Sequence, residues 1–311
     1  MKKVIITGAA GFLGLNLLTA LNTNKNNVVA IDKNNHNLLL ATKINSKIRV
    51  LCADLSVYDK KWEKSFKSAD CVIQLQAQLA SPKEEDYIKN NVISTKNVIS
   101  ACKKYKVNNL VYISTTAVAS VKDNIYNHTK KIGEELVKKS GIPYTILRPS
   151  WMYGCFDIKH FGFFIRIMSR SFIFPVPGNG KYLRQPLYVD DIINIIVKLV
   201  TEKPKNKTLI IVGKEKIYFV DLLKMIAKEL NKSFLFIKIP IPIFILLLKL
   251  FSLLTNKKPF EITQMKSLMA GDIFPFTNWD KKFKVNCTAF KNGIRNMLHS
   301  EYYKYGALMK E

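Results

Sequence analysis

The segment that most constrains this chain is a glycine-rich stretch close to its start. An apolar run, Val4 to Thr7, leads directly into Gly8-Ala9-Ala10-Gly11-Phe12-Leu13-Gly14, and a helical pattern follows. A strand, a glycine turn and a helix in this order place unpaired amides and the positive end of the helix dipole beside the turn, where a pyrophosphate can bind. We therefore predict a dinucleotide-binding turn whose contacts come from Gly8, Gly11, Phe12, Leu13 and Gly14.

Up to residue 154, short apolar runs alternate with single helical stretches. This alternation predicts a Rossmann-like α/β fold, a doubly wound parallel sheet with helices on both faces. From residue 155 the chain becomes rich in Phe, Pro and Gly and loses this rhythm. We expect a dinucleotide-binding Rossmann domain at 1–154 and a smaller C-terminal substrate-binding region at 155–311, with about 186–215 returning to the Rossmann domain.

Two aspartates stand where predicted strands end. Asp32 closes the run NVVAID, where a carboxylate can bind both hydroxyls of an adenosine ribose and repel a 2′-phosphate, which favours NAD over NADP. Lys33 follows immediately and leaves NADP open as an alternative. Asp54 ends the third predicted strand, where it can meet the adenine amino group or act as a helix N-cap.

Tyr126 and Lys130 begin a predicted helix and are four residues apart, so they lie on one helical face. In a chain this rich in lysine the pattern itself is expected by chance, and its position carries the argument. The pair follows the predicted strand VYISTTAV, and a helix in that place brings the Tyr/Lys pair to the nicotinamide end of a bound dinucleotide.

These segments together resemble the extended short-chain dehydrogenases/reductases of the NAD-dependent nucleotide-sugar epimerase/dehydratase family. The resemblance runs through TGAAGFLG, NNVISTKNV, VYISTTAV, YNHTK, IPYTILRPSWMYG and RQPLYVDDI. It implies Thr116, Tyr126 and Lys130 as catalytic residues. It also implies that Leu75 and Pro149 contact the cofactor, and that Asn91, Thr116 and Arg184 form the substrate site, with Arg184 on a diphosphate.

The chemistry of these residue types agrees with the implied roles. A tyrosine has a pKa near 10, and a neighbouring lysine ammonium and a nicotinamide cation both favour its phenolate form. The resemblance therefore implies an NAD-dependent epimerase acting on a nucleotide-activated sugar. Alternatives are a sugar-nucleotide dehydrogenase or ketoreductase, a sterol-type dehydrogenase, and a non-catalytic dinucleotide-binding subunit. The strand end QLQAQ departs from the family, which has small alanines there.

The net charge of +26 comes mostly from lysines spread over the whole chain, without a dense run or a nucleic-acid-binding motif. We therefore expect no nucleic-acid partner, and attraction to anionic small molecules or anionic lipid stays open. The five cysteines and four histidines show neither a disulfide framework nor metal-ligand spacing. We predict no metal site.

Two expectations concern location and assembly. The N-terminal apolar run is interrupted by Thr7 and Gly8 too early for a signal peptide, so we expect a cytoplasmic protein. The apolar segment Ile239 to Leu254 is too short to span a membrane. It predicts either a buried or dimer-facing helix or a peripheral membrane contact. The family resemblance also implies a homodimer through helices near 86–105 and 126–140.

Overall fold

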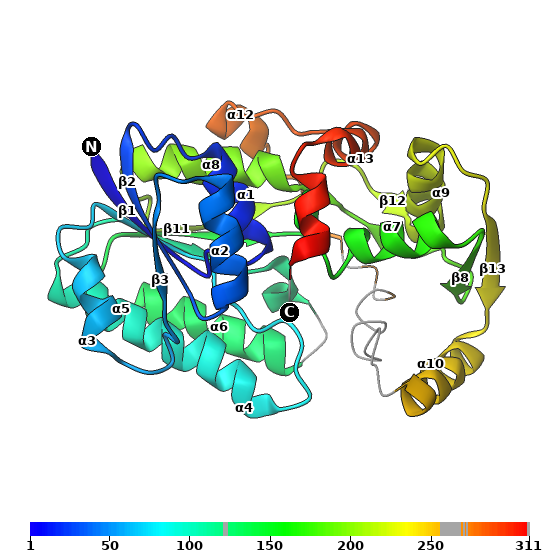
Figure 1. The fold of residues 1–311 in the computed structure, drawn as a ribbon, viewed down its shortest axis with the longest axis horizontal. Helices are drawn as coiled ribbons and strands as arrows, with labels where there is room; N and C mark the ends of the chain where they lie inside the picture. Colours follow the sequence, from blue (N-terminus) through cyan, green and yellow to red (C-terminus); the bar gives the residue numbers. More distant parts are fainter. Residues whose placement is uncertain (121–123, 256–268, 270, 272, 310–311) are drawn as a thin grey trace.

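A seven-stranded parallel sheet forms the centre of the computed structural model, which describes residues 1–120, 124–255, 269, 271 and 273–309 (Figure 1). The strand order is β11-β6-β5-β4-β1-β2-β3. The strands are β1 Lys2–Thr7, β2 Asn26–Asp32, β3 Arg49–Cys52, β4 Cys71–Gln74, β5 Leu110–Ile113, β6 Tyr144–Pro149 and β11 Lys207–Ile211. This sheet confirms the predicted Rossmann-like α/β fold.

Helices cover both faces of the sheet, which explains why its central strands are continuous apolar runs. Val4 and Ile6 of β1 face one hydrophobic cluster and Ile5 faces the other, and all three are fully buried. Figure 1 shows α8 and α1 above the sheet and α3, α5 and α6 below it. The helices of this half are α1 Phe12–Ala20, α2 Asn35–Ile44, α3 Lys60–Glu63, η1 Lys64–Phe66, α4 Glu84–Tyr87, η2 Ile88–Ile93, α5 Ser94–Lys104, η3 Thr116–Ala119, α6 Ile125–Lys138 and α8 Val189–Thr201.

The strand order changes direction at β1, which pairs with β2 on one side and β4 on the other. The chain first adds strands outward from β1 to β3 and then returns to build β4, β5 and β6 on the opposite side. In open parallel sheets, ligands bind beside the carboxyl ends of the strands at such a reversal. The glycine turn after β1 lies at this point.

The C-terminal region consists of short strand pairs and helices packed at one end of the sheet (Figure 1). The chain leaves the sheet after β6, and comes back through α8 and β11, which pairs with β6. The domain boundary at 154/155 remains our interpretation. The elements here are β7 Met152–Tyr153, α7 Phe161–Arg170, β8 Ile173–Pro177, β9 Leu183–Arg184, β10 Leu187–Tyr188, β12 Ile217–Tyr218, α9 Phe219–Glu229, β13 Leu235–Ile239, α10 Ile241–Thr255, α12 Trp279–Phe283, α13 Phe290–His299 and η4 Tyr303–Leu308.

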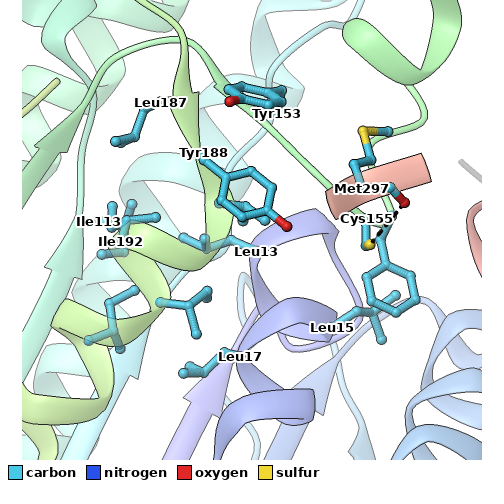
Figure 2. Close-up of a cluster of buried hydrophobic side chains, with 14 of the residues drawn as sticks. Leu13, Leu15, Leu17, Ile113, Tyr153, Cys155, Leu187, Tyr188, Ile192 and Met297 are labelled. Carbon is cyan, nitrogen blue, oxygen red and sulfur yellow. Dashed lines mark hydrogen bonds between the residues drawn. The ribbon is translucent and has the colours of Figure 1, made fainter. Parts of the chain in front are cut away.

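The two parts of the chain share one hydrophobic core, which Figure 2 shows around α1. Leu13 of α1 lies next to Ile192 of α8, and Cys155 lies beside Met297 of α13 (Figure 2). Asn16, buried on α1, donates its side-chain amide to the Cys155 carbonyl oxygen at 2.7 Å. The helix that follows the glycine turn is thus held in place by residues of both regions.

Candidate active site

At Gly8 and Gly14 the glycine turn has room for main chain only. Gly8 has a φ of +71°, and a Cβ there would clash with the main-chain amide of Gln76 at the end of β4. A Cβ on Gly14 would clash with the Ala9 carbonyl group. Gly11 is the N-cap of α1 and has no side chain to occupy the first amides of the helix. The turn therefore presents amides to the space above it, as a pyrophosphate requires.

Asp32, at the end of β2, is held in a fixed orientation beside this turn. Its carboxylate accepts hydrogen bonds from the main-chain amides of Ala10 at 3.0 Å and Asn34 at 2.9 Å. Burial raises the pKa of Asp32, and these amide bonds oppose the shift. The neighbouring Lys33 directs its ammonium to the Asn90 side chain at 2.8 Å. Asp32 is thus the group suited to ribose hydroxyls, and it disfavours a phosphate in their place.

A cavity of about 330 Å³ runs along the carboxyl ends of β1, β2, β4 and β5. Predicted cofactor residues that line it are Gly8, Gly11, Phe12, Leu13, Asp32, Asp54, Leu75, Tyr126 and Lys130. Asp54 also accepts a hydrogen bond from the Ser56 amide at 2.9 Å. Of the two remaining predictions, Gly14 packs α1 against Ala9, and Pro149 is buried at the end of β6, outside the lining.

Tyr126 lies in the first turn of α6, and Lys130 lies one turn further on. Asn124 caps this helix by accepting from the Asn127 amide at 2.8 Å, which fixes where the helix begins. The Lys130 ammonium, 1% exposed as a residue, donates to the Ile113 carbonyl oxygen at 2.7 Å and lies 4.3 Å from the centre of the Tyr112 ring. The helix therefore directs both side chains to the cavity.

Burial dominates the electrostatics of this pair. It raises the pKa of Tyr126 to about 12 and lowers the pKa of Lys130 to about 7. The group that opposes the shift of the Tyr126 pKa is the Thr115 hydroxyl, which hydrogen-bonds the tyrosine. We expected Lys130 to provide that support. The structure instead anchors the Lys130 ammonium on the Ile113 carbonyl oxygen, and a positive charge that enters the cavity would favour the Tyr126 phenolate.

The hydroxyl that contacts Tyr126 is that of Thr115, the residue before the predicted Thr116. Thr115 follows the last buried positions of the β5 segment and also caps η3, accepting from the Ala117 amide at 3.1 Å. Thr116 is the first residue of η3 and is only 6% exposed. Thr115 has extended backbone angles and Thr116 begins a helical turn, so the two side chains leave the chain in different directions. We predicted Thr116 as the catalytic and substrate-binding hydroxyl, and the contact with Tyr126 makes Thr115 a second candidate for that role.

Asn91, which we predicted to contact substrate, is buried beside the cavity and is not among the residues that line it. It lies on η2, a π-helical segment between α4 and α5, and is 1% exposed. Its side chain donates to Thr129 of α6 at 3.0 Å and accepts from the Gln78 amide at 2.7 Å. Asn91 thereby ties the loop after β4 to the helix that carries Tyr126.

Arg184, the predicted diphosphate ligand, lies one aromatic ring behind the cavity wall. Its guanidinium carbon is 5.6 Å from the centre of the Trp151 ring, which contacts Phe161 and lies edge-on to His160. His160 lines the cavity, whereas Arg184 and Trp151 do not.

Arg148, on β6, forms two hydrogen bonds with Glu134 of α6, at 2.7 and 2.6 Å. It secures α6 to the sheet.

Several lining residues carried no clear sequence signal. The loop 156–160 forms one wall, and its Asp157 carboxylate holds it by accepting from the amides of His160 and Phe161 at 2.9 and 2.8 Å. Met309 adds a contact from the C-terminal segment, where the Leu308 carbonyl oxygen lies 2.9 Å from His36 Nε2. Gln76 and Gln78 also line the cavity. Their run, QLQAQ, stands out in the sequence and is the one signal that could have found them.

Known proteins are similar to this chain in fold and in sequence. A profile of the NAD-dependent epimerase/dehydratase family matches residues 4–213. A putative UDP-glucose 4-epimerase of Methanocaldococcus jannaschii is 28% identical over 220 residues, covering 61% of this chain and 70% of that protein. The structure of a Thermotoga maritima UDP-glucose 4-epimerase with UDP-glucose has a TM-score of 0.77 at 18% identity, covering 99% of this chain and 100% of that one. A Bacillus cereus UDP-glucuronic acid 4-epimerase with NAD has a TM-score of 0.71 at 22% identity, covering 97% and 96%.

The fold and the Tyr/Lys pair at the dinucleotide cavity define an enzyme of the short-chain dehydrogenase/reductase type. The match over residues 4–213 shows that the chain belongs to the NAD-dependent epimerase/dehydratase family. The predicted family and the predicted cofactor, NAD, are confirmed. The glycine turn, the amide-bound Asp32 carboxylate and the cavity fit that cofactor. Among the described residues, no helix is long and apolar enough to cross a membrane.

Proposed function

We propose that this enzyme is an NAD-dependent epimerase acting on a nucleotide-activated sugar. The observation that carries the proposal is that Tyr126 and Lys130 line the same cavity as Gly8 and Asp32, with Thr115 bonded to the tyrosine. One cavity therefore contains groups suited to holding a dinucleotide and groups suited to moving a proton. The relatives whose names include UDP-sugars support the substrate class.

In this proposal, NAD held by the glycine turn and Asp32 would supply reversible hydride transfer at a sugar carbon, and the epimer would result from hydride return to the other face of that carbon. Thr115 donates a hydrogen bond to the sugar hydroxyl, and Tyr126 accepts the proton of that hydroxyl as the carbonyl forms. Tyr126 gives the same proton back when the hydroxyl is restored. Lys130, anchored on Ile113, retains N–H donors for ribose hydroxyls of the bound dinucleotide.

Two groups would hold the rest of the substrate. Arg184 is proposed to bind the sugar-linked diphosphate, because a planar guanidinium pairs with phosphate oxygens. Because Trp151 and His160 lie between Arg184 and the cavity, these two side chains would have to move aside when the substrate binds. His160, at the lining, would then contact the sugar or its phosphates.

The experiment is to incubate the purified chain with UDP-glucose, UDP-N-acetylglucosamine or UDP-glucuronic acid and follow the sugar by NMR. We expect the 4-epimer to form from one of them while the NADH absorbance does not rise. NADH that accumulates in proportion to product would identify a dehydrogenase instead. Mass analysis of the dinucleotide released by denaturation provides a second readout, since an epimerase restores its cofactor in every cycle and retains it.

We also propose a homodimer through the surface formed by α4, η2, α5 and α6. These helices lie together on the lower face of the sheet (Figure 1), and their packing positions Asn91 against Thr129 next to Tyr126. Light scattering of the purified chain measures the mass directly. A monomer at micromolar concentration would contradict this assembly without affecting the proposed reaction.

A further inference from the structure

Helix α10, Ile241–Thr255, is the most apolar surface feature of the described chain. It lies at the end of the molecule farthest from β1 and β2, below β8 and β13 (Figure 1). Between Ile241 and Leu254, no described side chain is buried. Because none of the described side chains of this helix is fully buried, core packing does not account for its apolar composition, and the exposed apolar residues are suited to contact with a partner.

The exposed side chains form one continuous stripe along α10. They recur at spacings of three and four residues, which brings them to one face of a helix. The stripe consists of Ile243 at 51% exposure, Leu246 at 55%, Leu247 at 48%, Leu250 at 45%, Leu253 at 81% and Leu254 at 83%. Phe244, Ile245 and Leu248 lie on the opposite face and are half-buried. The outward stripe is therefore wholly apolar.

The adjacent β8–β13 pair extends this apolar surface. Leu235 and Ile237 of β13 are 61% and 40% exposed, and Ile173 of β8, which pairs with Leu235, is 49% exposed. Residues two apart on a strand share one face, so Leu235 and Ile237 point to the same side. Helix α10 and the β8–β13 pair lie at the same end of the molecule (Figure 1), and both expose aliphatic side chains.

The charged residues within the segment that forms this surface are all positive. No aspartate or glutamate occurs from Leu230 to Thr255, a stretch that contains Lys232, Lys238 and Lys249. Lys238 and Lys249 are exposed. At 3.6 residues per turn, Lys249 falls at the border of the stripe, where its ammonium can extend beside the apolar face. An apolar stripe with a cationic border complements an anionic lipid surface.

The dimensions of α10 determine how it would contact lipid. Its 15 residues measure about 22 Å, against about 30 Å for the hydrocarbon core of a bilayer. It is therefore too short to span, and an in-plane position is the one that buries the stripe. A second copy of the chain fits this surface less well, because the segment from Leu230 to Thr255 offers no acidic side chain to pair with the lysines of another copy.

We propose that α10 is a membrane-surface helix that lies in the headgroup region of an anionic bilayer, with the stripe towards the acyl chains and Lys238 and Lys249 at the phosphates. The enzyme would then be attached by the C-terminal region, with the cofactor cavity on the main sheet away from the lipid. This contact is separate from the proposed reaction, and either can fail without the other.

Co-sedimentation of the full chain with lipid vesicles tests the proposal. We expect binding to vesicles of equal parts phosphatidylcholine and phosphatidylglycerol, much weaker binding to phosphatidylcholine alone, and loss of binding at high salt. The double substitution Leu246→Ser/Leu250→Ser should weaken binding about tenfold or more. Leu39→Ser is the matched control, since Leu39 on α2 is 56% exposed, like Leu246, but lies outside the stripe.

A second variant separates charge from apolar contact. Lys238→Gln/Lys249→Gln leaves the stripe intact and should weaken binding to the anionic vesicles about tenfold or more, with little change on phosphatidylcholine alone. Circular dichroism establishes that each variant is folded. Absence of vesicle binding by the unmodified chain overturns the proposal. So does a lipid-independent oligomer that Leu246→Ser/Leu250→Ser dissociates, since the stripe then contacts a second copy.

Discussion

The cofactor half and the C-terminal region differ in the chemistry that forms their ligand-facing surfaces. Around the glycine turn, recognition depends on main-chain amides and on one carboxylate fixed by two of them. In the C-terminal region, short strand pairs present side chains, with Trp151 and Arg184 behind the cavity wall and an aliphatic stripe on α10. A main-chain site needs glycines at fixed positions, which a sequence displays directly. A side-chain site needs contacts between residues that are distant along the chain, and a sequence does not display such contacts.

The largest expected effect follows from removing the proposed base. Tyr126→Phe keeps the ring on α6 and removes only the hydroxyl, so turnover should fall about a thousandfold or more. NAD binding should persist, because the glycine turn and Asp32 are untouched. Turnover assays and NADH fluorescence titration measure the two properties separately. Turnover within about tenfold of the unmodified enzyme would remove Tyr126 from the mechanism.

Substitutions at two adjacent residues test which threonine hydroxyl acts with Tyr126 in the cofactor half. Thr115→Val removes the hydroxyl that bonds Tyr126, and we expect turnover to fall about a hundredfold. Thr116→Val, at the buried neighbour, should change turnover less than about threefold. Both variants have the same shape change, so each controls for the other. The opposite ranking of the two turnover rates would support the original prediction of Thr116.

Main-chain packing at the turn predicts a large effect on stability. A Cβ on Gly14 meets the Ala9 carbonyl group, so Gly14→Ala should lower the free energy of unfolding by about 2–3 kcal/mol. Gly11→Ala is the matched control, because its Cβ would meet only the Gly8 oxygen at 3.4 Å and its φ is −83°. Urea unfolding of the cofactor-free chain gives both values. Equal losses would show that the clash does not govern stability.

Lys130 gives the cofactor-free protein a specific pH dependence. Burial lowers its pKa to about 7 from the ordinary value near 10.5, so the unfolded chain binds this proton more tightly than the folded one. Stability should therefore rise between about pH 7 and pH 9, by up to about 1.4 kcal/mol per pH unit from this group. Lys130→Met should remove that part of the slope. Thermal or urea unfolding of both chains across this range measures the difference.

The smallest effect is expected in the C-terminal region. Arg184→Gln removes the proposed diphosphate contact and should raise KM for the nucleotide-sugar about tenfold with a smaller change in kcat. Arg295→Gln is a control, because Arg295 pairs with Glu229 on the surface, away from the cavity. Steady-state kinetics separate the two constants. An unchanged KM would show that the substrate diphosphate binds elsewhere.

The same contrast explains what could be predicted from the sequence. The glycine turn, Asp32 and the Tyr126/Lys130 pair follow from residue types at strand and helix ends. Thr115 could not be separated from Thr116, because the choice depends on where the strand ends and which side chain then turns inward. The exposure of α10 could not be predicted from the sequence either, because a mostly apolar segment has no polar face that indicates its orientation.

The pairing of β11 with β6 has a consequence for how the molecule can be divided. A fragment ending at residue 154 would contain most of the sheet but would leave β6 as a bare edge and remove α8 from the apolar face of α1. Uncovered edges and apolar faces promote association between fragments. We therefore expect such a fragment to aggregate, and limited proteolysis to release no stable cofactor-binding piece. The shared core predicts that the chain unfolds as one cooperative unit, even though its proposed tasks are divided between two regions.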